Sequence, residues 1–245
     1  MRSDSVRFGL KTKLIVFSVL LTVVMTLLVT LSIYQVVNRQ LFNELRSKVL
    51  ATVKIGADAI DRQRMGRLVA LTRPDLPKEE VARLEDSADY RSLSDQLNRI
   101  RQTDPTVIRY VYTFIPTEDP NTTLFVVDAD VLDQLASRAK GEKIDDSEIS
   151  QIGTVFDVTD YERARESIKG KTATLDDKYV WDDVYKVNSI TAYAPILDGA
   201  GNLLAVMGID MADVNARTEL ADVTRLSLII AVAAVILGLL ASILL

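Results

Sequence analysis

Two long apolar stretches without charge, one near each end of the chain, limit what this sequence can fold into. Residues 14–37 and 226–245 contain no Asp, Glu, Lys or Arg. A helix rises about 1.5 Å per residue, so either stretch can cross a hydrocarbon core of about 30 Å. A cleaved signal peptide is the alternative for the first stretch, but its apolar core is too long and no small-x-small cleavage site follows before Tyr34. The sequence therefore predicts two transmembrane helices.

The charges beside the two stretches predict an orientation. Four basic residues precede the first stretch and three follow it closely, so the positive-inside bias is slight. Two spans place both chain ends on the same side of the membrane. The expected division is a basic cytoplasmic tail at 1–13, a span at 14–37, a domain outside the cytoplasm at 38–225 and a second span at 226–245.

The residue types that are missing exclude several classes of function. The chain has no cysteine and no histidine, so it has no disulfide, no thiolate nucleophile and no imidazole base or ligand. With 34 acidic against 29 basic residues the net charge is −5, which argues against a nucleic-acid partner. The acids Asp145, Asp146 and Glu148 lack the spacing of a calcium loop and are expected in a solvated loop. We expect no metal and no cofactor.

Periodicity between the spans predicts helices first and an antiparallel sheet afterwards, an α+β fold. A polar loop is expected from residue 128 to residue 150, and Thr159-Asp-Tyr-Glu162 reads as a capping box. The predicted helices are 38–71, 78–103 with an interruption at 87–89, a short one ending at Gly170, and 212–225; the predicted strands are 107–115, 122–127 and the two strands of a hairpin at 189–210.

The long helix predicted at 38–71 carries an apolar seam with two alternative explanations. The seam either joins two copies of the chain as a homodimer or packs only on the helix's own domain. Its residues are spaced alternately by three and four: Phe42, Leu45, Val49, Val53, Gly56 and Ile60.

The closing hairpin at 189–210 is the most informative stretch. Asp198-Gly-Ala-Gly-Asn202 has the composition of a tight turn. Ser189, Thr191 and Tyr193 alternate with apolar residues, which predicts one polar and one apolar face. The return strand is apolar until it reaches Asp210.

Two sets of residues resemble a known family. Arg109-Tyr-Val-Tyr-Thr113 with Leu124-Phe-Val-Val-Asp-Ala-Asp130 resembles the first hairpin of extracytoplasmic PAS-like (PDC, or Cache) sensor domains. Thr191-Ala-Tyr-Ala-Pro-Ile196 and the following stretch to Gly208-Ile-Asp210 resemble their closing hairpin. The resemblance implies a PAS-like sheet backed by the long N-terminal helix.

The same resemblance implies a function and a location. Such domains belong to two-span receptors of the bacterial inner membrane: histidine kinases, chemoreceptors and nucleotide cyclases. A small metabolite binds above the sheet and shifts the helix that enters the second span. Because the sequence stops at Leu245, inside the expected span, we expect the sensory part of a longer receptor whose output module lies beyond it.

The resemblance also suggests ligand-binding residues, each with a structural alternative. Asp210 matches the family's Gly-x-Asp strand end, where an acid meets a ligand amine, but it could equally cap the following helix. Trp181 and Asp182 lie in a loop, 178–185, expected to cover the pocket. The remaining candidates either line the pocket or serve as core aromatics, strand hydroxyls and turn acids: Tyr110, Tyr112, Asp128, Asp130, Thr191 and Tyr193. The arginine-containing signature of amino-acid-binding relatives is absent.

Two other classes of function compete with a sensor. One is a ligand-free structural module that spaces the membrane helices. The other is a membrane-anchored enzyme that uses a carboxylate pair, Asp128 with Asp130 or Asp182 with Asp183, for acid–base chemistry. We expect no catalysis, since neighbouring acids at turns are far more often solvated.

Overall fold

A computed structural model describes residues 9–182, 187–212, 225–226, 228–233, 236–237 and 240. The chain divides into two compact units. One unit comprises residues 1–43 and 217–245, and the other comprises residues 44–216. The candidate ligand-binding residues all belong to the second unit.

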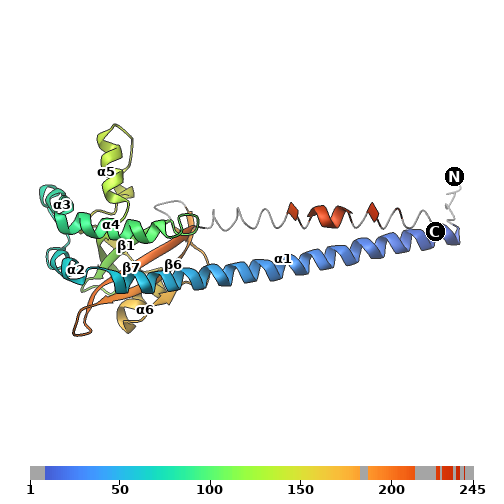
Figure 1. The fold of residues 1–245 in the computed structure, drawn as a ribbon, viewed down its shortest axis with the longest axis horizontal. Helices are drawn as coiled ribbons and strands as arrows, with labels where there is room; N and C mark the ends of the chain where they lie inside the picture. Colours follow the sequence, from blue (N-terminus) through green and yellow to red (C-terminus); the bar gives the residue numbers. More distant parts are fainter. Residues whose placement is uncertain are drawn as a thin grey trace, which may run out of the picture. The chain divides into compact units, whose positions relative to one another are not determined.

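A single long helix, α1 (Leu10–Ala59), begins the described chain (Figure 1). The stretch from Val16 is apolar and long enough to cross a membrane, and its most apolar window has no buried side chain. This agrees with the expected first span. The described residues of the second apolar stretch are helical, but half of that stretch lies outside the described residues.

The prediction of one helix from 38 to 71 is wrong at its C-terminal end. The helix α1 stops at Ala59, and a separate helix, α2 (Arg62–Val69), follows. Asp61 caps α2, because its Oδ1 accepts the backbone N–H groups of Gln63 and Arg64. The next two helices, α3 (Lys78–Glu85) and α4 (Ala88–Gln102), are interrupted as predicted, with Ser87 as the cap of α4.

The strands form one antiparallel sheet in which the two predicted hairpins lie side by side. Its order is β3-β2-β1-β7-β6-β4, and β5 pairs with the start of β6. The closing hairpin runs through the expected turn, where Gly201 has a φ of +83°. The strands are β1 (Tyr110–Pro116), β2 (Thr122–Asp128), β3 (Val155–Asp157), β4 (Thr174–Leu175), β5 (Val180–Asp182), β6 (Val187–Leu197) and β7 (Leu203–Ala212).

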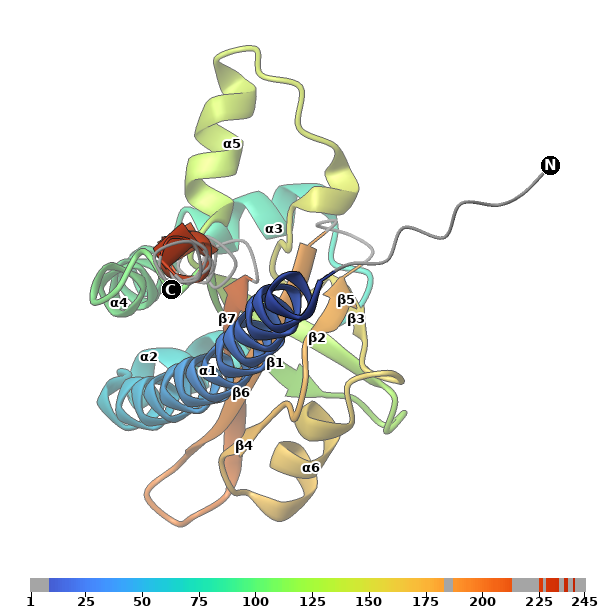
Figure 2. The ribbon, with the colours of Figure 1, turned by 90° about the vertical axis from the view of Figure 1, so that its right-hand side faces the viewer.

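Both faces of the sheet are covered, so the predicted polar face of β6 is not a solvent face. Helices α2 and α4 pack on β7, β1 and β2, while α6 (Glu162–Gly170) packs on β6, β7 and β4 (Figure 2). On β6, Thr191 is 2% exposed and Tyr193 is fully buried. The face that carries Tyr193 and Tyr112 packs against Ala164 of α6, and the alternate residues face the other way.

Three segments differ from their predictions. The expected polar loop contains a helix, α5 (Val131–Ala139), and a short 3₁₀ turn, η1 (Asp146–Glu148). The capping box is wrong, because Tyr161 occupies the cap position of α6 without a side-chain cap. The expected helix from Ala212 is wrong at its start, because Ala212 is the last residue of β7; residues 213–224 lie outside the described part of the chain.

Candidate functional site

Four of the predicted ligand-binding residues line one small cavity on the α6 side of the sheet. They are Tyr110 and Tyr112 of β1, Asp128 at the end of β2 and Asp210 near the end of β7. The cavity has a volume of about 30 Å³. This is room for about one water molecule, so the site as folded is closed to a metabolite.

The sheet register brings Tyr112 and Asp210 together. Tyr112 pairs with Gly208, and its ring lies across β7 because Gly208 has no side chain there. The Tyr112 hydroxyl donates to Asp210 Oδ1 at 3.1 Å. Burial, followed by the negative charge of Asp210, raises the pKa of Tyr112 well above its usual value, so this hydroxyl stays a donor.

The structure excludes one of the two alternatives for Asp210, namely that it caps a helix beginning at Ala212. Asp210 lies within β7, where it pairs with Tyr110 on one side and Thr191 on the other. It is followed by two further strand residues, so it does not cap a helix beginning at Ala212. Its side chain is 7% exposed and faces the cavity.

Asp128 is a second buried carboxyl on the cavity wall. It is 6% exposed, and its Oδ1 accepts the backbone N–H of Asp130 at 2.8 Å. Burial raises the pKa of Asp128 to about 7, and the nearby charge of Asp130 adds to the rise. Behind it lies the hydroxyl of Tyr90, fully buried and without a hydrogen-bond partner in the described chain.

The neighbouring strand β6 extends this polar group. The Tyr193 hydroxyl is fully buried and has no partner of hydrogen-bond geometry among the described residues. Burial raises the pKa of Tyr193, and the charges of Asp176 and Asp210 raise it further. Asp176 is itself buried, accepts the N–H of Thr191 at 3.1 Å and has a pKa raised by burial to about 6.

Asp130 faces a different hollow. It pairs with Arg101 and lines an open polar groove of about 520 Å³ beneath α5. The two acids proposed as an enzymatic pair, Asp128 and Asp130, therefore have different surroundings. Tyr110 lines both the groove and the cavity, and the guanidinium of Arg109 lies 5.4 Å from the centre of its ring.

The expected pocket-covering loop is an edge strand as far as the structure describes it. Residues 180–182 form β5, in which Trp181 pairs with Asn188 and is 50% exposed. Trp181 does not line the cavity. The side chain of Asp182 and the whole of Asp183 lie outside the described part of the molecule, and so does the proposed pair that they form.

Sequence reasoning missed the side chains that close the cavity. Phe125 of β2 and Phe156 of β3 stack with ring centres 5.1 Å apart, and Ser150 completes the lining. Ser150 and Phe156 come from the segment after α5, whose path no local pattern gives. Alternation alone would place Phe125 and Asp128, which are three residues apart in β2, on opposite faces, and the irregularity in the β1–β2 register brings both to the cavity.

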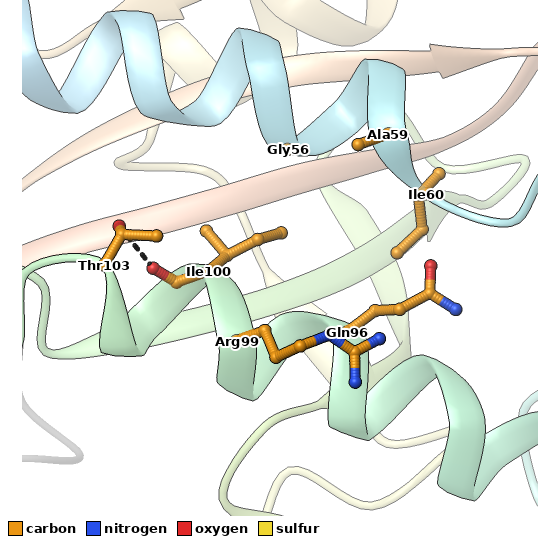
Figure 3. A pocket seen from close by; sticks show the side chains of 7 residues that line it. All are labelled: Gly56, Ala59, Ile60, Gln96, Arg99, Ile100 and Thr103. Carbon is orange, nitrogen blue, oxygen red and sulfur yellow. Dashed lines mark hydrogen bonds between the residues drawn. The ribbon is translucent and has the colours of Figure 1, made fainter.

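A third hollow lies between helices α1 and α4 (Figure 3). It is a groove of about 280 Å³ with mostly apolar walls. The Gln96 side chain at its edge accepts the N–H of Asp61. It contains no acidic residue: Gly56, Ala59, Ile60, Gln96, Arg99, Ile100 and Thr103 line it.

The cavity is therefore an aromatic site with two carboxyl groups. Of the described residues that line it, none is basic. Ionised carboxylates and the faces of aromatic rings both favour a positive charge. The arrangement suits a small cation or amine better than an organic acid.

No protein-family model matches the sequence, and no curated protein matches it. Among solved structures, the chain is similar to the ligand-binding domain of the Campylobacter jejuni chemoreceptor Tlp3 in complex with 4-methylisoleucine. The identity is 14%, the match covers 82% of this chain and 63% of that one, and the TM-score is 0.41. A second structure, methyl-accepting chemotaxis protein X, is 12% identical, with coverages of 76% and 65% and a TM-score of 0.38.

This chain thus spans just under two thirds of each of these two structures. At TM-scores below 0.5 the likenesses carry no argument about ligand or mechanism. The two adjacent hairpins in one antiparallel sheet and the long N-terminal helix are the features expected from the sequence. The fold is α+β. Within it, the cavity at Asp210 lies on the sheet face opposite α2 and α4.

Proposed function

We propose that this chain is the sensory part of a membrane receptor, with a small cationic or amine-bearing metabolite as its ligand. The observation that carries the proposal is that two buried carboxyl groups, Asp128 and Asp210, line an aromatic cavity whose described lining includes no basic residue. A positive charge bound between these groups would interact favourably with both of them and with the ring faces.

Ligand binding requires the cavity to open, because its volume of about 30 Å³ is too small for a metabolite. The wall contributed by Ser150 and Phe156 comes from the segment between α5 and α6, outside the strands that hold the two acids. This wall moves outward on binding, while β1 and β7 remain in place. A ligand that binds the open form more tightly shifts the population toward it.

The signal then leaves through β7. Asp210 is two residues from the end of β7, and the chain continues from Ala212 toward the second apolar stretch. We assign to β7 the transfer of the change to the second span and to an output module of the kinase, cyclase or chemoreceptor type. The receptor would reside in a bacterial inner membrane with residues 44–216 outside the cytoplasm.

Thermal unfolding of the full chain in lipid nanodiscs tests the proposal. Small organic cations, zwitterions and acids are compared as ligands. A true ligand at about 100 times its Kd stabilises the folded state by about 3 kcal/mol. Asp210→Asn should abolish the rise in melting temperature for the cations that stabilise the parent.

Asp119→Asn is the matched control, because Asp119 is an exposed acid in the β1–β2 turn. This variant should retain the full rise. A rise that persists in Asp210→Asn would overturn the site assignment. A flat response to every ligand class would instead favour the ligand-free structural module.

A further inference from the structure

The groove between α1 and α4 opens beside an apolar strip on the surface of α1 (Figure 3). Ile55 is 69% exposed, and the exposed Ala51 and Ala59 lie one turn to either side of it on the same helix face. Ala59 also lines the groove, so the strip and the groove form one continuous apolar surface. Single exposed apolar side chains are ordinary, but a large one beside an apolar hollow indicates a contact site.

Two charges on this surface are available to a partner. Arg99 lines the groove and forms no ion pair with a described residue. The Asp58 side chain is 85% exposed, and its ion pair with Arg62 is long, at 3.5 Å. Asp58 also stands one residue before the end of α1, where the helix dipole disfavours a negative charge. A positive charge outside the chain would therefore stabilise it.

Contacts between α1 and α4 show which of their residues lie at the same height. The two helices run antiparallel, because residues further along α1 meet residues further back along α4: Gly56 lies against Ile100, and the N–H of Asp61 donates to Gln96 Oε1 at 3.0 Å. Ile55 is therefore close to the height of Ile100. Asp58, between Gly56 and Asp61, is close to the height of Arg99.

Helix geometry places Asp58 and the groove on opposite sides of Ile55. Successive residues of a helix turn by about 100°, so Asp58 is turned about 60° from Ile55 one way and Gly56 about 100° the other way. Gly56 lines the groove. A two-fold axis that passes beside Ile55, parallel to α1, preserves height and brings each side of one copy against the opposite side of the other. Asp58 of one copy then faces the groove of the second copy at the height of Arg99.

We propose that this surface is the contact between two copies of the chain, with Ile55 at its centre and each Asp58 paired with Arg99 of the other copy. A second copy fits because the surface supplies its own complement in both shape and charge. The parallel direction of the two helices rests on the membrane anchoring in the proposed function, since two copies in one bilayer share one orientation. All of these residues belong to the unit 44–216, and the contact uses a different face of α1 from its buried seam.

Engineered disulfides test the centre of the contact. The chain has no cysteine, so an introduced one reports its own position alone. The full chain carrying Ile55→Cys is reconstituted into phosphatidylcholine vesicles and treated with a mild oxidant. A disulfide-linked dimer should form, because the contact brings the two Cα atoms within the distance of about 7 Å that a disulfide spans.

Lys54→Cys is the matched control for this experiment. Lys54 is also exposed, but the next helical position is turned about 100° away from the two-fold axis. Ile55→Cys should cross-link severalfold faster than Lys54→Cys. Equal rates at the two positions would mean that the copies meet by random collision, and would overturn the proposal.

Charge exchange tests the pairing of Asp58 with Arg99. In the Ile55→Cys chain, either Asp58→Arg or Arg99→Asp alone should slow cross-linking about fivefold, because each places like charges opposite one another. The two changes together should restore the rate, since they form the same pair with the charges exchanged. Glu118→Arg, at an exposed acid of the β1–β2 turn, should leave the rate unchanged. A double variant as slow as the single ones would refute the pairing.

Ligand-dependent melting separates failure of this contact from failure of the proposed function. A chain that shows the Asp210-dependent rise in melting temperature but no preference for cross-linking at residue 55 is a sensor without this contact, which overturns the inference. A chain that cross-links preferentially at residue 55 but responds to no ligand retains the contact and contradicts the sensor. A chain that does not float with the vesicles contradicts the membrane anchoring, and with it the parallel arrangement.

Discussion

Gly208 is the residue that makes the arrangement at Asp210 sterically possible. A Cβ at this position would stand 2.6 Å from two ring carbons of Tyr112. The neighbouring strands hold Tyr112 and Tyr193 on either side of Gly208, and both are buried, so the Tyr112 ring has little room beyond the small cavity that it lines. The missing side chain therefore positions the donor of the Tyr112–Asp210 hydrogen bond.

Gly208→Ala should displace the Tyr112 ring and lower the melting temperature. Overpacking of this kind typically costs about 1–3 kcal/mol. Gly199→Ala is the control, since a Cβ on Gly199 would meet nothing within 4 Å. Differential scanning calorimetry of the two variants checks the prediction, and equal melting temperatures would contradict it.

Asp128 should make the domain less stable as the pH rises. Its folded pKa of about 7 lies above the usual 3.8, so the folded state binds the proton more tightly than the unfolded state. The stability that this group contributes is complete below about pH 4 and is lost as the pH rises through 7.

Asp128→Asn keeps an acceptor for the N–H of Asp130 but removes the titration. Relative to the parent, this variant should gain stability between pH 5 and 8, by an amount of the order of 1–4 kcal/mol. Asp145→Asn is the control, because Asp145 is an exposed acid whose pKa is lowered by its Ser147 hydrogen bonds. Melting temperatures measured across this pH range test the prediction. If the difference between Asp128→Asn and the parent did not change with pH, the prediction would be refuted.

The residues of the site were predictable where strand register alone brings them together. Alternation along β1 and β7, which are neighbours in the sheet, predicts the shared face of Tyr110, Tyr112 and Asp210. Asp176 and Phe156 were not predictable, because they reach the site through short strands and turns that carry no period. The sequence predicts Trp181 in a loop that covers the pocket, whereas the structure pairs its backbone with β6 at the edge of the sheet.

At the level of elements, the break between α1 and α2 shows how a single cap overrides a continuing apolar pattern. Asp61 provides two hydrogen bonds to the start of α2, and its own N–H is bonded to Gln96. Asp61→Ala should cost about 1 kcal/mol. Asp58→Ala should cost little, since the Asp58 side chain is 85% exposed and its ion pair is at the surface. Urea denaturation of both variants measures the difference, and equal midpoints would show that the cap is dispensable.

The apolar seam of α1 packs on its own domain, which is the second of the two explanations that the sequence leaves open. Val49 and Val53 are fully buried within residues 44–216, whereas Ile55 on the other side is 69% exposed. A homodimer, if the receptor forms one, must therefore use a different face of α1 from the predicted seam.

Val53→Ala should consequently lower the stability of the domain by about 1–3 kcal/mol through the cavity it leaves. Ile55→Ala, which removes an exposed side chain, should leave the melting temperature unchanged. Sedimentation of the same two variants reports association separately. Loss of association without loss of stability in Val53→Ala would restore the seam as a dimer interface.

The elements that the sequence missed share a cause. The helix α5 is only nine residues long, and of its side chains only Val131 is buried, so its pattern is too short to be distinguished from a polar loop by sequence alone. The extension of β7 to Ala212 depends on pairing with Ser189, a long-range contact without a local signal. Long periodic segments were predictable, whereas boundaries set by tertiary pairing were not.

For the whole molecule, the division into two units separates membrane contact from folding. The first unit presents exposed leucines and valines along α1, as expected of a segment surrounded by lipid. In the second unit, the buried core residues run in sequence from Leu45 to Met211. The residues that form the described ion pairs all fall within 46–177. Residues 44–216 therefore contain the contacts that hold the sensory domain together.

A fragment of residues 44–216 should then fold without lipid. It retains the last four turns of α1, which include the buried Val49 and Val53. Glu44 at the new helix start places a negative charge at the positive end of the helix dipole, which is stabilising. Its unfolding should be cooperative, with a melting temperature within a few degrees of that of the full chain in nanodiscs. A second fragment, 61–216, lacks α1 and exposes the apolar surface that those valines cover, so it should lose the sharp transition. Near-ultraviolet circular dichroism distinguishes the two. If both fragments melt alike, α1 belongs to the membrane unit alone, and ligand-driven motion must reach the bilayer through β7.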